Sequence, residues 1–405
     1  LMADEKNWKL SRKKIIKDQN NLKDKEELEL RDLSIIEPSH IVCTLGHSLN
    51  LDSLIKSIRL NLSSRRKLIL PVSKYFQKKI VNRCLLKYWE KYIDIIYDEK
   101  QSNFYLNKLN SLRVWDNVSI PCGNENAIQY HSDSVYIQKK WEEKNYSPLL
   151  SLTQEHKERG FKILEKIGIS KNDWFVILHV RSHNTKKDNL EILNPDLHDY
   201  YPAMKEITKS GGWVIRIGDK TMEKLDPMEN VYDYAHSNLK SDWMDIFLMG
   251  SAKFMLGTSS GPSVVSHVFG VPIVMTNFSS LTSIYLGKKD IILLSKFFDL
   301  KTNQNLPYRK VAKLPYSWAY NKKWLKNHFN ISTSFNSSSE IKIATSEMIQ
   351  KLKNKKPSNI NEDYEIQKKF KKIFKESKNF IGLTDLEIQC NISKNFYLTN
   401  KNLFT

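Results

Sequence analysis

The chain has 405 residues, which is enough for two domains that each bury a core of their own. Hydrophobic residues make up 40% of it and aromatic residues 11%, so its composition is not that of a disordered chain, and no apolar run approaches the ~20 residues that span a bilayer. Lysine and arginine total 64 against 45 acidic residues, and the formal charge of +19 favours polyanionic partners such as nucleic acid, an anionic membrane or phosphorylated substrates. The excess of positive charge can also reflect a generally lysine-rich composition that is unrelated to any partner, and both interpretations stay open.

Four cysteines lie far apart, with no CxxC pair and no histidine spacing suited to zinc: Cys43, Cys84, Cys122 and Cys390. We interpret them as reduced thiols and predict no metal site. The first residues contain no hydrophobic signal core. The expected location is therefore the cytoplasm, with peripheral attachment to an anionic inner membrane as a further expectation from the positive charge.

Residues 1–37 are highly charged with amphipathic spacing, and we predict a helical extension there. Short apolar runs then alternate with helical patterns, which is typical of a parallel, doubly wound sheet, and we expect an N-terminal Rossmann-like domain over 38–150. Its predicted elements are strands at 40–45, 67–72 and 92–97 and helices at 51–62 and 76–88. Residues 119–146, which contain Pro121, Gly123 and many asparagines, indicate an irregular loop.

A second alternation follows a predicted helix at 152–168 and indicates a C-terminal Rossmann-like domain over 151–355. Its predicted strands are 174–180, 213–218, 231–234, 253–256 and 271–275, and its predicted helices are one capped by Asp242 and those at 198–209, 263–269 and 338–352. The pattern weakens over 278–334, where we expect loops, and 356–405 is expected to be a basic helical tail. Two facing doubly wound domains place a ligand cleft outside the carboxyl ends of their strands.

A loop of very small residues, Gly257-Thr258-Ser259-Ser260-Gly261, joins the strand at 253–256 to a helix with Pro262 in its first turn. Small residues here let an anionic group approach bare amides at the positive end of the helix, and the hydroxyls add further donors for a diphosphate. An ordinary tight turn has the same composition, so this loop alone does not show that an anion binds here. No lysine follows it and it is not GxGxxG, so it does not support an ATPase or a nicotinamide enzyme.

The strand at 174–180 ends in His179-Val180-Arg181. Residues two apart in a strand point to the same face, so the imidazole and the guanidinium would share one side of a strand end. Arginine offers a rigid fork for phosphate, and histidine a shorter donor or an acid–base group. A packed strand-end histidine beside a surface arginine is the alternative interpretation.

Two further groups are candidates for the same cleft. Asp219, Asp233 and Tyr234 follow neighbouring predicted strands, where they could stack on a base or accept from ribose hydroxyls, although turn-capping carboxylates beside a core tyrosine fit equally well. Gly46-His47 follows the first predicted strand of the N-terminal half. His47 would face across the cleft and suit a general base for an acceptor hydroxyl.

With the stretches HVRSHN (179–184), RIGD, VYDYA and DIFLMGSAKFMLGTSSGPS (245–263), the sequence resembles a family of bacterial glycosyltransferases from surface-glycan gene clusters. That family has the GT-B fold, in which two Rossmann-like domains face each other across a cleft, and its second half is similar to GDP-fucose-using transferases. The resemblance implies an arginine from the HxR strand end on the nucleotide diphosphate, here Arg181 with His179. It also implies a later loop around the phosphates, here Thr258, Ser259 and Ser260 after Gly257.

The same resemblance implies that an acidic residue before that loop reads the base or the ribose, and Asp242 and Asp245 both fit. It implies a metal-independent enzyme without a cofactor, whose substrates are a nucleotide sugar and a glycan or surface-polysaccharide acceptor. Ser182-His183-Asn184 departs from the fucosyltransferases, which have a second arginine or acidic residues at this point. The donor nucleotide and sugar therefore stay open.

Two other functions remain as alternatives. The charge of +19 also fits a nucleic-acid or anionic-surface binding protein without catalysis, which predicts clustered basic and aromatic residues on one face. A nucleotide-sugar epimerase would hold the same ligand in a cleft and would turn it over without an acceptor.

Overall fold

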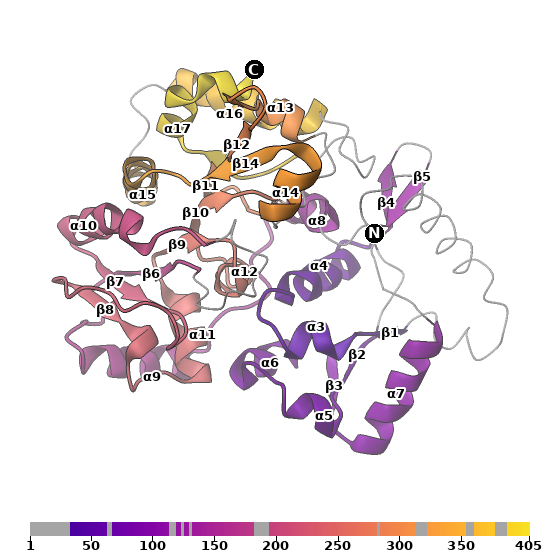
Figure 1. Ribbon diagram of the computed structural model, residues 1–405. Helices are drawn as coiled ribbons and strands as arrows, with labels where there is room; N and C mark the ends of the chain where they lie inside the picture. Colours follow the sequence, from indigo (N-terminus) through magenta and orange to yellow (C-terminus); the bar gives the residue numbers. More distant parts are fainter. Residues whose placement is uncertain are drawn as a thin grey trace.

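The computed structural model describes residues 33–62, 67–112, 119–122, 125–128, 132–181, 194–281, 284–312, 322–353, 360–376 and 387–405. Within these ranges the chain forms two α/β halves, each built on a parallel sheet, which confirms the predicted fold class (Figure 1). The helical extension predicted for 1–37 lies outside the described residues up to position 32, and 33–35 form a strand instead. The division of the chain into four parts stays a prediction.

The N-terminal half holds a three-stranded parallel sheet in the order β1-β2-β3. Helices follow the strands, and α7 packs against β1 and β2. The elements of this half are β1 (Leu33–Ile35), α3 (Pro38–Val42), α4 (Ser48–Arg59), β2 (Lys67–Pro71), α5 (Lys74–Gln77), α6 (Arg83–Trp89), β3 (Asp94–Ile96) and α7 (Glu99–Leu112).

The first strand of this sheet is not where the sequence placed it. Residues 38–42 form helix α3, and the strand precedes this helix. Glu37 accounts for the difference, because its carboxylate accepts a hydrogen bond from the Ser39 N–H at 3.2 Å and so caps the helix, while Pro38 fits the first turn. These start signals override the apolar run at 40–45.

Two other predictions for this half were wrong. The helix expected at 76–88 is two helices, because Asn82 accepts from the Leu85 N–H at 2.8 Å and begins α6. The expected loop at 119–146 contains the hairpin of β4 (Ser119–Cys122) and β5 (Glu125–Ile128), followed by α8 (Ser132–Glu143), which packs on α4.

The C-terminal half is organised by a parallel sheet with seven described strands, in the order β8-β7-β6-β9-β10-β11-β15. In chain order its first six strands have the 3-2-1-4-5-6 arrangement of a Rossmann sheet. Every residue of β6, β9, β10 and β11 is buried, as expected for parallel strands covered on both faces. The elements around this sheet are α9 (Gln154–Glu165), β6 (Phe175–His179), η2 (Leu197–Tyr200), α10 (Tyr201–Lys209), β7 (Trp213–Arg216), β8 (Val231–Asp233), η3 (Tyr234–His236), α11 (Asp242–Ser251), β9 (Phe254–Thr258), α12 (Gly261–Val268), β10 (Ile273–Phe278), β11 (Ile291–Leu294) and α15 (Ser338–Leu352).

Helices cover both faces of this sheet. On one face α10 packs against β7 and α15, and α15 extends over β10 and β11. On the other face α11 packs against α9 and α12, and Phe247 of α11 lies against Phe175 of β6 with ring centroids 6.3 Å apart. The predicted helix at 338–352 is confirmed as α15, with Ser337 and Glu340 forming its capping box.

The region after Asn277 is more regular than expected. The loops predicted for 278–334 include a small antiparallel sheet in the order β13-β12-β14, made of β12 (Lys296–Asp299), β13 (Gln304–Asn305) and β14 (Ile331–Ser334), with helices α13 (Tyr308–Val311) and α14 (Lys322–Phe329). The basic tail adds α16 (Ile360–Glu376), β15 (Asn391–Ile392), α17 (Lys394–Thr399) and η5 (Lys401–Phe404). Because β15 pairs with β11 and Phe370 and Phe404 are buried, this segment belongs to the core of the C-terminal half.

The two halves touch through the helices at the centre of Figure 1, where α4 packs on α12 and α6 packs on α11. Asp242 was expected to cap α11, but the N-cap residue is Ser241. The Asp242 carboxylate instead accepts from the Arg83 N–H at 2.8 Å, and the Asp242 carbonyl accepts from Asn82 Nδ2 at 2.9 Å. Asp242 therefore joins the N-terminal half to the C-terminal half.

Candidate functional site

The centre of the large sheet contains its topological switch point. After β6 the chain crosses to β7 on one side, and after β9 it crosses to β10 on the other side, while β6 and β9 are neighbours. Ligands of open α/β sheets bind outside the carboxyl ends of the strands at such a point. At this end of the pair His179 lies opposite Gly257.

Gly257 is required by the packing of these two strands. A Cβ atom at this position would lie 2.0 Å from the backbone oxygen of His179, which leaves no room for any side chain. The sequence analysis assigned this glycine to the approach of a ligand. The structure gives it a second and sufficient reason, because the two strands meet more closely here than a side chain allows.

The loop after β9 is held by its own hydroxyl groups. Thr258 is buried, and its Oγ1 accepts from the Arg181 N–H at 3.1 Å, which ties the end of β6 to the loop. The Ser263 hydroxyl accepts from the Ser260 N–H at 3.0 Å and donates to the Ser260 carbonyl at 2.7 Å, which fixes the start of α12. Ser259, between them, is half-buried. The capping box uses the Ser260 and Ser263 amides, and Pro262 has no N–H. What this turn offers an anion is therefore the Gly261 amide and the positive end of the α12 dipole.

His179 and Arg181 supply different chemistry at the strand end. Burial lowers the pKa of His179 to about 3, assisted by the positive charges of Arg216 and Arg181, so the imidazole is neutral at physiological pH. Its Nδ1 is buried and has no hydrogen-bond partner among the described residues. Arg181 is half-buried and provides a permanent positive charge. The site therefore combines one fixed cation with a neutral imidazole.

The N-terminal half contributes a loop to the same place. A Cβ atom on Gly261, the first residue of α12, would lie 2.8 Å from Leu45 Cβ and 3.3 Å from the Gly46 nitrogen. His47 follows directly and occupies the N-cap position of α4, which lies beside α12 (Figure 1). His47 thus adjoins the α12 N-terminus, although it follows a helix and not the strand that the sequence predicted.

A buried polar network at the end of β10 bonds to the first residue of the loop, Gly257. Thr276 of β10 donates to the Gly257 carbonyl at 3.1 Å and lies 2.5 Å from the Tyr200 hydroxyl, which also accepts from Asn277 Nδ2 at 3.2 Å. Burial raises the pKa of Tyr200 well above its ordinary value, so this hydroxyl stays protonated. Tyr200, Thr276 and Asn277 were not among the predicted site residues. A hydroxyl and an amide at the end of an apolar strand, in Val274-Met275-Thr276-Asn277, are the available signal.

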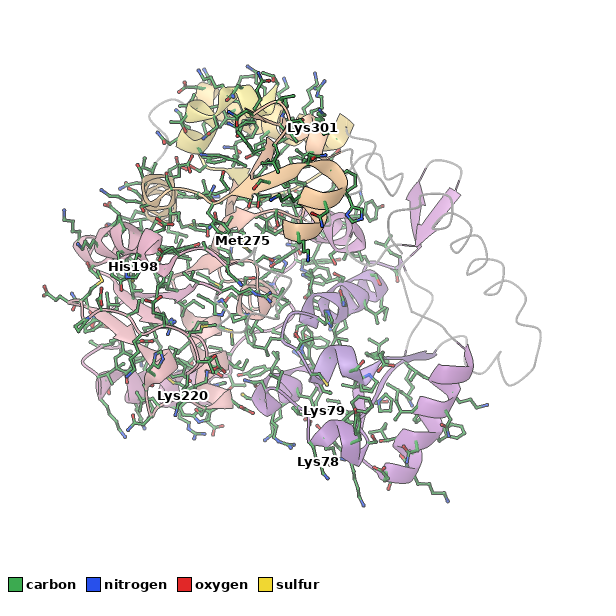
Figure 2. The ribbon with its side chains drawn as sticks, in the orientation of Figure 1. Lys78, Lys79, His198, Lys220, Met275 and Lys301 are labelled. Carbon is green, nitrogen blue, oxygen red and sulfur yellow. The ribbon has the colours of Figure 1, made fainter. Side chains whose placement is uncertain are left out.

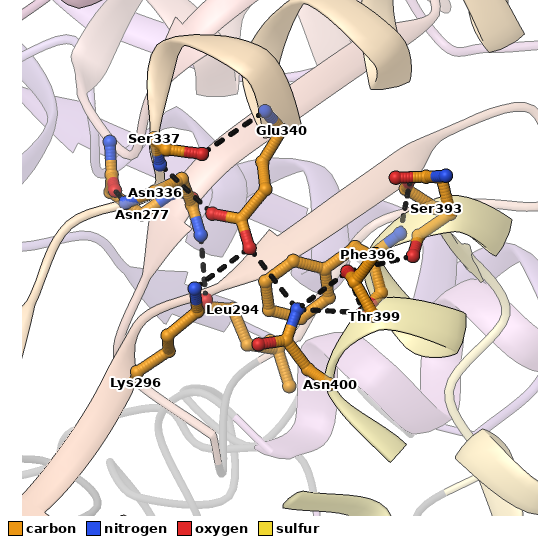
Figure 3. Close-up of polar contacts among 11 residues, drawn as sticks. Asn277, Leu294, Lys296, Asn336, Ser337, Glu340, Ser393, Phe396, Thr399 and Asn400 are labelled. Carbon is orange, nitrogen blue, oxygen red and sulfur yellow. Dashed lines mark hydrogen bonds and ion pairs between the residues drawn. The ribbon is translucent and has the colours of Figure 1, made fainter.

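The network continues to the C-terminal segment, as Figure 3 shows. Asn277 and Asn336 exchange hydrogen bonds, each side-chain oxygen accepting from the backbone N–H of the other residue at 2.5–2.6 Å. Glu340 accepts from Lys296 at 2.7 Å and from Asn400 Nδ2 at 3.1 Å. These bonds tie the end of β10 to the start of α15, and the start of α15 to β12 and to Asn400.

The residues predicted to read a base or ribose have partners within the protein. Asp233 accepts from Arg216 at 3.0 Å and lies 2.9 Å from His236 Nδ1. The buried Tyr234 hydroxyl donates to Asp245 at 2.7 Å.

The other two carboxylates of this group hold turns or join the halves. Exposed Asp219 accepts from the Thr221 N–H at 2.9 Å, and Asp242 binds Arg83 of the N-terminal half. Each of the five residues thus has a local structural task, and base recognition by them stays a prediction.

No group of three or more histidine, cysteine, aspartate or glutamate side chains in the described part of the chain is arranged to hold a metal ion. None of the helices within those ranges is long and apolar enough to cross a membrane. Cys43, Cys84 and Cys390 are free thiols.

No family model matches the sequence, and no curated protein matches it at a significant level. The solved structures to which the chain is similar include three glycosyltransferase structures. One is a glycosyl transferase of family 9 from Veillonella parvula, with 11% identity, a TM-score of 0.44, and 79% of this chain matched to 96% of that chain.

Another is the iron-containing dodecameric glycosyltransferase TibC from enterotoxigenic E. coli, with 11% identity, a TM-score of 0.38, and 80% of this chain matched to 75% of that chain. The third is the dodecameric iron-containing heptosyltransferase TibC in complex with ADP-D-beta-D-heptose, with 11% identity, a TM-score of 0.38, and 79% of this chain matched to 76% of that chain.

Proposed function

We propose that this protein is a glycosyltransferase that moves a sugar from a nucleotide-diphosphate-sugar donor to a hydroxyl group of a glycan acceptor. The observation that supports this proposal is the meeting of three segments at the switch point. The end of β6 brings His179 and Arg181, the loop before α12 brings backbone amides, and the N-terminal half brings His47. One half thus offers an anion site and the other half offers a base.

The chemistry follows from these groups. Arg181, the Gly261 amide and the positive end of α12 stabilise the negative charge that develops on the diphosphate as its bond to the anomeric carbon breaks. His47 accepts the proton of the acceptor hydroxyl while that oxygen forms the new bond to the anomeric carbon. His179 stays neutral and contributes hydrogen bonding without charge.

The finer points of the proposal come from the sequence resemblance. We propose catalysis without a metal ion or cofactor, a surface-polysaccharide acceptor, and a cytoplasmic enzyme that associates with an anionic membrane. A GDP-linked sugar is the first donor to test, because the second half of the sequence resembles GDP-fucose-using transferases.

A nucleotide screen followed by a transfer assay tests the proposal. GDP, UDP, ADP, dTDP and CMP are added to the protein, and the midpoint of thermal unfolding is measured. We expect one of them to raise this midpoint, since a ligand that binds only the folded state stabilises it. The matching nucleotide sugars are then assayed for nucleotide release with a glycan acceptor.

His47→Ala is expected to keep the thermal shift and to lower the transfer rate by about 10²- to 10⁴-fold, the usual contribution of a general base. The matched control is His328→Ala, which removes an exposed histidine of α14. No stabilisation by any nucleotide, together with salt-dependent DNA binding, would instead indicate a nucleic-acid binding protein. Turnover of a nucleotide sugar that needs no acceptor would indicate an epimerase.

A further inference from the structure

The N-terminal half meets the first turn of α11 through α6, the helix that follows Lys79 in Figure 2. Besides the two bonds at Asp242, a third contact runs through His156 of α9. Its Nδ1 lies 2.7 Å from the Tyr88 hydroxyl of α6, and its Nε2 lies 2.7 Å from the Trp243 carbonyl of α11. One imidazole therefore bridges a helix of each half, and we call this Tyr88–His156–Trp243 chain the α6 joint.

The partners of His156 define where its proton lies. The Trp243 carbonyl can only accept, so Nε2 carries the hydrogen, and Nδ1 of the neutral ring accepts from the Tyr88 hydroxyl. The Tyr88 oxygen in turn accepts from the Thr153 N–H at 3.3 Å, at the start of α9. Because each of these atoms has one defined role, the joint is complete only with a neutral imidazole.

His156 is held firmly on the C-terminal side of the α6 joint. A Cβ atom on Gly160, one turn further along α9, would lie 2.2 Å from the Phe247 ring, so α9 packs very closely on α11. Thr153 caps α9 by accepting from the His156 N–H at 3.2 Å. The position of His156 is thus a fixed feature of the C-terminal half.

The α6 joint also reaches the helix that begins at the candidate anion site. The ring centroids of Tyr88 and Phe269, the C-cap residue of α12, are 5.3 Å apart in an edge-on arrangement. At the other end of α12, Gly261 meets the loop of Leu45 that precedes His47. The N-terminal half therefore contacts α12 at both of its ends, and the α6 joint holds one of them.

We propose that Tyr88 and His156 are positioning residues for the transfer reaction, because their hydrogen bond sets the N-terminal half, with His47, against α12. The proposal rests on the proposed function, in which the base and the diphosphate site belong to different halves. A displacement of about 1 Å between reacting groups can lower a rate by about 10²-fold. The α6 joint acts on the rate by this route and leaves the donor site itself intact.

The protonation state of His156 controls the α6 joint. Burial lowers the pKa of His156, and the positive charge of Arg159 lowers it further, while the Trp243 carbonyl and Glu155 oppose the change. A proton on Nδ1 would point at the Tyr88 hydroxyl, which could then no longer donate to the imidazole. The other titratable groups around the joint are Cys84 and Lys87 of α6 and Asp242 of α11.

Steady-state kinetics and calorimetric titration of three variants test the proposal. Tyr88→Phe removes only the hydroxyl group. His156→Gln keeps a donor for the Trp243 carbonyl but loses the acceptor for Tyr88, whereas His156→Asn keeps an acceptor near the Nδ1 position. Tyr97→Phe is the matched control, since Tyr97 is an exposed tyrosine of the same half. The measured quantities are kcat and KM of transfer and the affinity for the nucleoside diphosphate that stabilises the wild type most.

We expect Tyr88→Phe and His156→Gln each to lower kcat by about tenfold or more, with an unchanged affinity for the nucleoside diphosphate. The double variant should lose no more than either single variant, because both remove the same bond, and His156→Asn should recover part of the rate. Wild-type kcat in both Tyr88→Phe and His156→Gln would overturn the proposal while the proposed function stands. Absence of transfer by the wild type with every donor would contradict the proposed function itself.

The pH dependence of stability is a second measurement of the α6 joint. Because the folded pKa of His156 is lowered, the folded protein binds fewer protons than the unfolded chain below the ordinary pKa of 6.5, and stability is lost as the pH falls from there. The Tyr88 hydroxyl favours the neutral ring, so Tyr88→Phe should raise this pKa. The midpoint of thermal unfolding should then fall less in Tyr88→Phe than in the wild type between about pH 7.5 and about pH 5.5. An equal fall in both proteins would contradict the role of the neutral imidazole.

Discussion

Arg181→Ala is expected to weaken binding of a nucleoside diphosphate by about 10²- to 10³-fold, the largest effect on binding we anticipate from one substitution. The guanidinium is a permanent cation at the switch point. The Arg181 backbone N–H donates to Thr258 Oγ1 at 3.1 Å, which fixes the strand end that carries this side chain. The neighbouring His179 does not replace it, because burial keeps that imidazole neutral. Calorimetric titration of the stabilising nucleotide measures the effect.

Two variants control this experiment. Arg181→Lys keeps the charge but loses the planar fork, and an intermediate loss of affinity is expected. Arg159→Ala removes an arginine that stacks 3.9 Å from the Trp243 ring on the outer surface of α9, and binding should be unaffected. Equal affinities for wild type and Arg181→Ala would rule out this arginine as the diphosphate ligand.

Gly257→Ala is expected to cost about 3 kcal/mol or more of unfolding free energy, because the new methyl group would lie 2.0 Å from the His179 carbonyl oxygen. Both strands are fully buried at the centre of the sheet and cannot separate without breaking adjacent pairings. Urea denaturation followed by circular dichroism measures the loss.

Gly211→Ala is the matched control. Gly211 also has a positive φ of 84°, but a methyl group there meets no atom within 4 Å. We expect it to cost only about 1 kcal/mol, the strain of the left-handed backbone. A Gly257→Ala protein no less stable than Gly211→Ala would show that the two strands tolerate a wider spacing than the structure describes.

Most of the C-terminal half could be predicted from the sequence because its strands are buried on both faces. The run at 174–180 reads as continuous apolar sequence, and it is strand β6. The short elements could not be predicted in this way. Strand β1 has three residues and β15 has two, and neither presents a period that a sequence pattern can reveal.

Some parts of the candidate site could also be predicted from the sequence, and others could not. The link between Arg181 and Thr258 follows from strand ends that the sequence already marked, because parallel strands of one sheet end at one edge. His47 lies beside the α12 N-terminus although the element before it was mispredicted, since the loop after α3 reaches α12.

The roles of the acidic residues could not be predicted, because the local sequence does not show which partner a carboxylate will have. Asp242 binds the Arg83 backbone, 159 positions away, and Asp233 binds Arg216 on the neighbouring strand. The partner of a carboxylate is set by the tertiary packing, so a turn cap, a link between the halves and a ligand contact have the same sequence signature.

The most direct test of the central claim is a crystal structure of the protein with the nucleoside diphosphate that stabilises it. We predict that the diphosphate lies between Arg181 and the Gly261 amide at the start of α12, with the His47 loop on the opposite side of it. A nucleotide bound away from the β6–β9 switch point would contradict this account.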